Sequence, residues 1–244
     1  MCGRYALTLS PERFREFFQY VEQPNFPPRY NIAPTQPVPV VVEESGARHF
    51  RLMRWGFLPE WVKDPTQYPL VINARAESLV SKPSFKAAIR YRRCIFLADG
   101  FYEWRRGASP KQPFLVRMRS REPMPMAGLW ETYSDPDGGE IDTAAIVTTA
   151  ANPAMSAIHE RMPAILDQAG VEKWLSISNC PVGDALEVAR PCPESWLDMI
   201  PVSTRLNNAR EDDAELQTEV PPLEEKSGLV RKATAKNPAQ GSLF

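Results

Sequence analysis

The chain has 244 residues, a formal net charge of −1 and 43% hydrophobic residues, which suits one large domain or a domain with a short tail. A near-neutral charge argues against non-specific coating of duplex DNA, although it leaves room for a local basic cleft. The N-terminus lacks the apolar core of a signal peptide, and no apolar run is long enough to span a bilayer, so we expect a cytoplasmic protein.

Cysteine and histidine are scarce and scattered. The chain has four cysteines and two histidines, and no two cysteines form a CxxC pair. These residues offer few ligands for zinc, so the sequence predicts neither a metal site nor a cofactor. Apart from Cys2, we expect the cysteines to be buried free thiols in a reducing compartment.

The first helix is predicted from its cap and its apolar spacing. After an expected strand over residues 2–9, Ser10 suits an N-cap and Pro11 suits the first helical position. The following apolar residues recur at i, i+3, i+4 and i+7, which predicts one buried helix face. These residues are Phe14, Phe17, Phe18 and Val21.

Strands and turns are predicted for most of the next hundred residues. A proline-rich loop covers 24–39, and residues 38–43 and 48–54 form a hairpin pattern around Ser45-Gly46. A short helix is expected near residues 84–91. Beta-branched and aromatic residues with turn-rich borders then predict strands over 94–104, 113–119, 125–133 and 142–150.

The remaining pattern mixes short helices with one last strand. Helices are expected over 152–159, 170–175 and 182–188, and a strand over 196–203. The fold class is therefore α+β. From Ala209 the composition becomes acidic and then poor in apolar residues, which predicts a domain over 1–208 and a largely disordered tail over 209–244.

Cys2 is the residue with the most distinctive chemistry. Removal of Met1 would leave an α-amine and a thiol on adjacent carbons. An aldehyde can form a Schiff base with the amine, and the thiol can then close a five-membered thiazolidine. Reference pKa values of about 8 for the amine and about 8.5 for the thiol imply modest activation near neutral pH. The alternative is a cysteine placed at position 2 by chance.

Three other positions suit catalysis or anion binding. Glu103 follows an apolar strand between Tyr102 and Trp104, a setting that can raise a carboxyl pKa and favour acid–base catalysis. His159 suits proton transfer near neutral pH. Asn73 could orient an amine or a sugar oxygen. Each also has an ordinary structural interpretation, as an outward strand residue, a satisfied histidine or a turn asparagine.

Cations could bind phosphates along two segments. Arg75 follows Asn73 closely and could hold a phosphate by two hydrogen bonds. A run without acids suggests a phosphate track, although such runs are more often solvated helix faces. The run consists of Lys82, Lys86, Arg90, Arg92 and Arg93.

Seven motifs in order resemble the SOS-response-associated peptidase (SRAP) family from Met1 to about Val202. They are MCGRY, RYNIAPTQ, RWGFLPEW, INARAES, CIFLADGFYEW, KQPF and IHERMP. The resemblance implies a single domain of curved, mainly antiparallel sheets with peripheral helices. It also implies crosslinking of Cys2 to the opened aldehyde of an abasic site in single-stranded DNA, by a monomer that associates with the nucleoid when it acts.

Site residues follow from the same resemblance. Cys2 matches the nucleophile, Asn73 the asparagine that holds the reacting terminus, Glu103 the acid–base group and His159 the residue that assists ring opening. The residues implied to contact DNA are Arg4, Pro34, Trp61, Arg75, Lys82, Thr148 and Arg161.

Two other functions fit the sequence. One is a thiol autopeptidase or amidase that uses Cys2, as the family name suggests. The other is a non-covalent reader of damaged or modified DNA. A peptide substrate separates the first from DNA crosslinking, and a denaturing gel separates the second.

Overall fold

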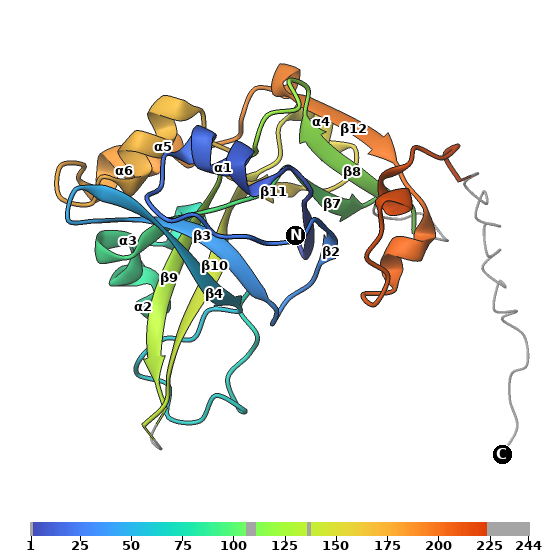
Figure 1. Cartoon of the computed structure of the whole chain (residues 1–244). Helices are drawn as coiled ribbons and strands as arrows, with labels where there is room; N and C mark the ends of the chain where they lie inside the picture. The colour runs from blue at the N-terminus through green and yellow to red at the C-terminus, as the bar shows by residue number, and fades with distance from the viewer. Residues whose placement is uncertain (1, 106–110, 136–137, 224–244) are drawn as a thin grey trace, which may run out of the picture.

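Two β-sheets and short peripheral helices make up the chain in the computed structural model, which describes residues 2–105, 111–135 and 138–223 (Figure 1). The predicted α+β class, with mainly antiparallel sheets, is confirmed. No helix in these residues is long and apolar enough to cross a membrane.

The smaller sheet has five strands, in the order β12-β8-β7-β1-β2, and every neighbouring pair is antiparallel. Its central strand pair, β1 with β7, carries the N-terminal end of the chain past the segment that contains Glu103. The strands are β1 (Arg4–Leu7), β2 (Arg29–Ile32), β7 (Gly100–Trp104), β8 (Pro113–Met118) and β12 (Leu197–Pro201).

The larger sheet has seven strands and closes on itself. Pairing runs from β10 through β4, β3, β6 and β9 and returns to β10, so five strands form a ring. Two short strands, β5 and β11, pair with the end of β10. The strands are β3 (Pro37–Glu44), β4 (Ala47–Trp55), β5 (Asn73–Arg75), β6 (Arg93–Phe96), β9 (Met126–Ser134), β10 (Glu140–Ala150) and β11 (Arg161–Pro163).

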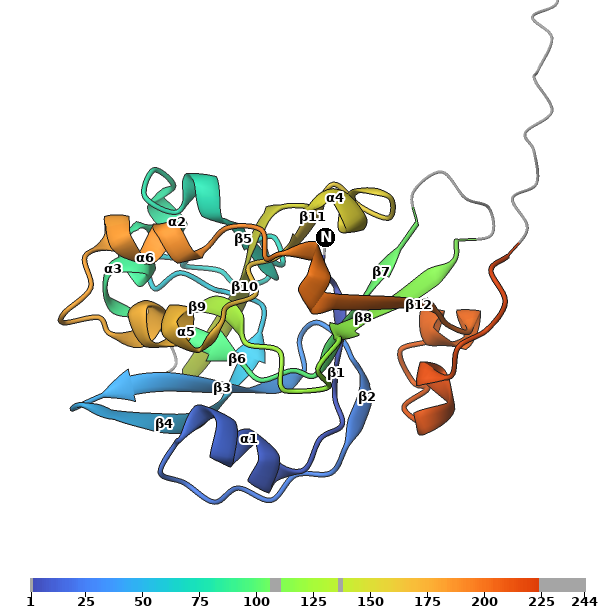
Figure 2. The same cartoon turned by 90° about the horizontal axis from the view of Figure 1, so that it is seen from above.

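The helices surround the sheets, as both views show (Figures 1 and 2). The two-part helix α2–α3 and the pair α5–α6 confirm the predicted helical segments, and α4 is shorter than expected. The helices are α1 (Pro11–Phe18), α2 (Pro83–Lys86), α3 (Ala88–Tyr91), α4 (Pro153–Ser156), α5 (Gln168–Leu175) and α6 (Val182–Val188).

The first helix shows where local sequence rules succeed and where they fail. Ser10 caps α1 by accepting a hydrogen bond from the Arg13 amide, and Phe14 and Phe18 are buried, as predicted. Val21 was predicted to share their face but is 58% exposed. The reason is that Gln19 takes a left-handed conformation at φ 58° and ends the helix before Val21 is reached.

Aromatic packing joins the two sheets into one core. Tyr5 of β1 packs edge-to-face against Trp55 at a centroid distance of 5.4 Å and against Phe96 at 6.3 Å. All three rings are fully buried. Because Tyr5 belongs to the small sheet and its partners to the large one, this contact fixes the N-terminal strand relative to the ring of strands.

Residues 209–223, placed in the predicted tail, pack against the small sheet. Asp212 accepts hydrogen bonds from the amides of Tyr30 and Asn31 at 2.5 and 3.0 Å, and Leu216 is fully buried. Arg205 pairs with Glu211, Asp213 and Glu215, so three of the acids that suggested disorder are held by ion pairs to one arginine. The rest of the predicted tail, 224–244, lies outside the described residues.

Leu216→Ala tests whether this segment is part of the folded domain. Leu216 packs in a cluster with Tyr102, Leu115 and Val202, so its truncation should lower the free energy of unfolding by about 2–5 kcal/mol. Leu223→Ala is the control, because that side chain is 37% exposed, and it should change the unfolding free energy little. Equal urea midpoints for Leu216→Ala and the unmodified protein would show that the segment contributes nothing to stability.

Candidate active site

Cys2 lies at the junction of the two sheets. Its carbonyl oxygen accepts a hydrogen bond from Nδ2 of Asn73 at 3.0 Å, and its thiol points to the Arg4 carbonyl oxygen at 3.8 Å. The side chain of Cys2 is completely buried. Since β1 belongs to the small sheet and β5 to the large one, the Asn73 contact ties the N-terminal residue across the junction.

Asn73 is held in place by long-range pairing. It begins β5, which pairs in parallel with β10, and Asn73 is opposite Ile146. The residue before it is also fixed, because the indole N–H of Trp55 donates to the Ile72 carbonyl at 3.0 Å. Oδ1 of Asn73 is buried and accepts no hydrogen bond from any described residue. One end of this carboxamide therefore anchors Cys2 while the other offers an acceptor.

Glu103 approaches Cys2 along the β1–β7 pair. Arg4 is opposite Tyr102, so the antiparallel register carries the residues before Arg4 past Glu103. Glu103 is 4% exposed. Burial raises the pKa of the Cys2 thiol well above its ordinary value, and the nearby negative charge of Glu103 raises it further. The modest activation expected from the sequence therefore does not apply to this thiol in its buried position.

His159 follows α4, and its ring is held by the main chain of Arg161. The Arg161 amide donates to Nδ1 at 2.9 Å, and the Arg161 carbonyl oxygen lies 3.2 Å from the same nitrogen. In the neutral ring, Nδ1 accepts this hydrogen bond and therefore carries no proton, so the ring proton is on Nε2. In the charged ring, Nδ1–H can donate to the carbonyl instead, so each protonation state has a partner.

A pocket of about 440 Å³ brings Glu103 and His159 together. Four further residues line it and were not singled out from the sequence, namely Trp104, Arg105, Lys111 and Asn207. Trp104 and Arg105 directly follow Glu103 in the chain, so their place next to a predicted catalytic residue could have identified them as lining residues. No sequence signal pointed to Asn207, because it is distant from Glu103 in the chain. The fold brings it close, and its Oδ1 accepts a hydrogen bond from the Trp104 indole N–H at 2.7 Å.

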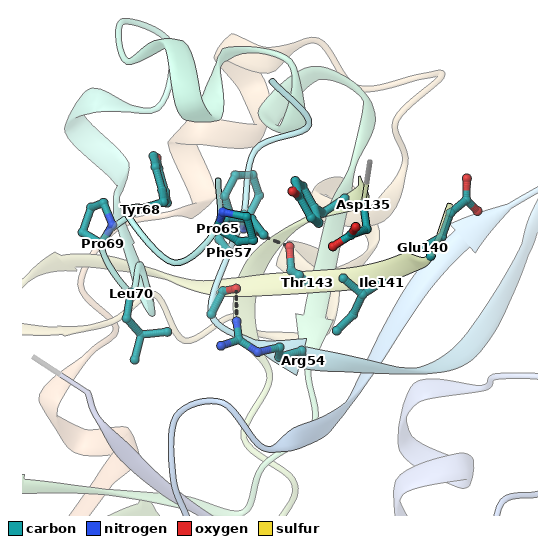
Figure 3. A pocket seen from close by; sticks show the side chains of 14 residues that line it. Arg54, Phe57, Pro65, Tyr68, Pro69, Leu70, Asp135, Glu140, Ile141 and Thr143 are labelled. Carbon is teal, nitrogen blue, oxygen red and sulfur yellow. Dashed lines mark hydrogen bonds between the residues drawn. The ribbon is translucent and has the colours of Figure 1, made fainter. Parts of the chain in front are cut away.

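A larger pocket, of about 640 Å³, lies apart from these reaction residues (Figure 3). Arg54, Phe57 and Tyr68 line it together with the start of β10, and the Arg54 guanidinium donates to the Gly56 carbonyl at 3.1 Å. None of Cys2, Asn73, Glu103 and His159 lines this pocket. Size alone therefore does not identify the reactive site.

Three of the residues expected to contact DNA are brought together at the end of β10. Thr148 is opposite Arg75 on one side, and its carbonyl oxygen accepts a hydrogen bond from Arg161 at 2.6 Å. Arg75 is exposed, whereas Thr148 is fully buried. The Arg161 guanidinium is also paired with Glu77, so Arg75 is the more accessible cation of this group.

The other four residues lie on separate elements. Nη1 of Arg4 donates to Asn31 Oδ1 at 2.7 Å and to the Leu206 carbonyl at 3.0 Å, which holds one end of the guanidinium in the fold. Pro34 is half-buried between β2 and β3. Trp61 is 58% exposed and packs edge-on against Tyr68, and Lys82 is exposed before α2.

The basic run is only partly available as a phosphate track. Lys82, Lys86 and Arg90 are all exposed, at the N-cap of α2, the end of α2 and within α3. Arg92 instead pairs with Glu131 at 3.0 Å. Arg93 is fully buried and donates to the Ser176 and Cys180 carbonyls. The last two cations of the predicted track therefore stabilise the fold.

Within the described parts of the chain, no group of three or more His, Cys, Asp or Glu side chains is arranged to hold a metal ion. The four cysteines are all free and buried. The expectation that the reaction needs no metal or cofactor stays a prediction.

The raised pKa of Cys2 predicts slow alkylation in the folded protein. Iodoacetamide reacts with the thiolate, and raising the pKa reduces the thiolate fraction at pH 8. Peptide mapping after timed alkylation should show Cys2 modified at least ten-fold more slowly in the native protein than in the urea-unfolded chain. Equal rates in the two states would contradict the buried, protonated thiol.

Comparisons with known proteins identify the family of the chain. Residues 1–209 match the family model for SOS response associated peptidase (SRAP). The chain is 33% identical over 220 residues to abasic site processing protein YoqW of Bacillus subtilis (strain 168), covering 88% of this chain and 98% of that protein. It is 31% identical over 281 residues to abasic site processing protein HMCES of Xenopus tropicalis, covering 97% and 83%.

Solved structures share the fold. A protein from Bacteroides thetaiotaomicron superposes with a TM-score of 0.81 at 23% identity, over 90% of this chain and all of that one. A phage-related protein from Bordetella bronchiseptica gives a TM-score of 0.66 at 26% identity, over 91% of this chain. With the family model matched across nearly the whole described chain, this protein belongs to the SRAP family.

Proposed function

We propose that this protein processes abasic sites by trapping them covalently in single-stranded DNA through Cys2, after removal of Met1. The observation that carries the proposal is the hydrogen bond from Asn73 to the Cys2 carbonyl, which holds a residue with aldehyde-trapping chemistry beside Glu103. Relatives named abasic site processing proteins support the substrate class.

The chemistry joins the aldehyde of the opened abasic sugar to both groups of Cys2. The α-amine adds to C1′, and loss of one water gives an imine. The thiol sulfur then bonds to the same carbon while its proton passes to the nitrogen, which closes a thiazolidine. The sum of the steps is one aldehyde and one aminothiol converted to one ring and one water.

The amine reacts first because the thiol is buried and protonated. The raised pKa of Cys2 leaves little thiolate to attack the aldehyde directly. We expect Oδ1 of Asn73, which has no partner among the described residues, to accept an N–H from the reacting nitrogen, while Nδ2 keeps the Cys2 carbonyl in place. Glu103 then accepts or returns the proton that the thiol releases on ring closure.

His159 acts earlier, on the closed sugar. The Arg161 amide occupies Nδ1 of His159, so Nε2 is the ring nitrogen that can act on the substrate. The His159 ring lines the same pocket as Glu103. In the imidazolium form, His159 donates its Nε2 proton to the ring oxygen of the sugar while the C1′ hydroxyl loses its proton to water, so the ring C–O bond breaks and the aldehyde forms. Because Arg161 offers both a donor and an acceptor to Nδ1, the imidazole can change protonation state without losing its orientation.

The substrate is expected to be a single strand that a monomer binds without a membrane or a cofactor. An unpaired sugar can enter the pocket directly, whereas a duplex sugar must first be extruded at a cost of a few kcal/mol. We expect Lys111 and Arg105, which line the pocket, and Arg75, at the end of β10, to contact phosphates of the bound strand.

The family name leaves a peptidase activity as the second candidate. The match to the peptidase model over residues 1–209 favours it, with removal of Met1 as the simplest peptide cleavage. Cleavage of an added peptide by a protein that forms no adduct with abasic DNA would favour this alternative.

Cys2→Ala should abolish the covalent adduct and keep the affinity for intact single-stranded DNA within about two-fold, because phosphate contacts do not involve the thiol. Denaturing gels with an abasic single strand, an intact strand and an abasic duplex measure this directly. The unmodified protein should shift only abasic DNA, and the single strand faster than the duplex.

Two results would contradict the proposal. One is a heat-stable adduct formed equally well by Cys2→Ala. The other is binding of abasic DNA in native gels by the unmodified protein with no adduct in denaturing gels, the behaviour of a non-covalent reader.

A further inference from the structure

A carboxylate–arginine clamp lies directly behind His159. Glu77 accepts two hydrogen bonds from Arg161, at 2.7 Å from Nη1 and 2.9 Å from Nη2. Nη2 of Arg161 also donates to the Thr148 carbonyl at 2.6 Å and lies 3.3 Å from its hydroxyl. The clamp therefore ties β11 to β10 and to the 3₁₀ turn Ala76–Ser78 that follows β5.

The clamp acts on the residue whose main chain orients the histidine. Both groups that face Nδ1 of His159, the amide at 2.9 Å and the carbonyl at 3.2 Å, belong to Arg161. Strand β11 has three residues, so the side-chain clamp at Arg161 adds to the support that its short ladder with β10 gives this main chain. Fixing the Arg161 side chain at two sites restricts the main chain that His159 depends on.

We propose that Glu77 is a positioning residue that holds His159 in its Nε2–H tautomer through Arg161. The role of His159 itself rests on the proposed function, while the geometric link from Glu77 to the imidazole does not. Glu77 contacts neither Cys2 nor the pocket that Glu103 and His159 share.

The arrangement favours positioning over phosphate binding by Arg161. The Arg161 side chain is 13% exposed, and the two-pronged edge that suits a phosphate is already filled by Glu77. Nε of Arg161 is buried with no hydrogen-bond partner among the described residues, so it is not presented to solvent. A phosphate could bind this edge only by displacing Glu77. If Arg161 binds phosphate, removal of the Glu77 carboxylate should tighten DNA binding. If Glu77 positions His159, the same change should slow the reaction.

Imidazole ¹⁵N spectra test the link without DNA. The chain has two histidines, and a His49→Gln variant assigns their signals. In the unmodified protein at high pH, Nε2 of His159 should carry the proton and Nδ1 should not. In Glu77→Gln the two ¹⁵N shifts should move toward each other as the tautomers mix. His49, which pairs with Glu22 at 2.7 Å, is the internal reference and should not change.

Crosslinking kinetics separate positioning from competition with phosphate. Glu77→Gln should lower the rate at saturating abasic single strand on the order of ten-fold or more, because small misplacements of a catalytic group are costly. Its Kd for intact single-stranded DNA should change less than two-fold. Glu77→Asp, which keeps the charge on a shorter side chain, should recover part of the rate.

Glu122→Gln is the matched control, because it breaks another paired carboxylate–arginine contact, with Arg13, away from His159. It should leave both the ¹⁵N shifts and the rate unchanged. Glu77 is 55% exposed, so the glutamine variant should fold, as an unchanged His49 signal would confirm.

Three outcomes would overturn the positioning role of Glu77 or distinguish its failure from failure of the proposed function. Unchanged ¹⁵N shifts in Glu77→Gln would overturn the positioning role. Tighter binding of intact DNA with an unchanged rate would overturn it too, and would make Glu77 a competitor of phosphate. No adduct from the unmodified protein would sink the proposed function, while the spectra would still decide whether Glu77 orients His159.

Discussion

The arrangement of the site depends on one hydrogen bond across the junction of two sheets, from Asn73 Nδ2 to the Cys2 carbonyl at 3.0 Å. Cys2 precedes a strand of the small sheet, and Asn73 begins a strand paired to the large one. Tyr5, three residues further on, packs against Trp55 and Phe96 and prevents the two sheets from sliding. Residues near a chain terminus are usually the least ordered part of a domain, yet Cys2 is held by Asn73 and is followed by a strand packed between the two sheets.

That fixation explains how an ordinary aminothiol can be selective. A free thiol at a flexible terminus would meet any electrophile, whereas the Cys2 thiol is buried and its pKa is raised by burial and by Glu103. In the proposed reaction, the substrate aldehyde is therefore captured first by the amine of Cys2. In the proposed function, the same burial favours a substrate without a base, since a bare sugar is smaller than a complete nucleotide.

Local sequence rules predicted the individual helices and strands but not the contacts between them. The Ser10 cap and the Ser45-Gly46 hairpin follow from residues within one turn of the chain, and both are confirmed. The order of motifs identified the family and named Cys2, Asn73, Glu103 and His159. Their contacts depend on a parallel β5–β10 pair between segments about seventy residues apart, which no periodicity encodes. Composition gave the wrong prediction where charged residues have partners in the fold. Arg93 is buried against carbonyl oxygens, and Glu211, Asp213 and Glu215 pair with Arg205.

The most direct test of the account is the mass of the adduct formed by chains with a free or a blocked N-terminus. A thiazolidine takes nitrogen and sulfur from the same residue, and an amide nitrogen cannot form an imine because its lone pair is delocalised into the carbonyl. Protein beginning at Cys2 should form a heat-stable adduct whose mass equals protein plus abasic strand minus one water, mapped to the N-terminal peptide. The fraction crosslinked should follow the fraction of chains that begin at Cys2, measured by intact mass. A heat-stable adduct on protein verified to carry an uncleaved N-terminal extension would contradict the central claim.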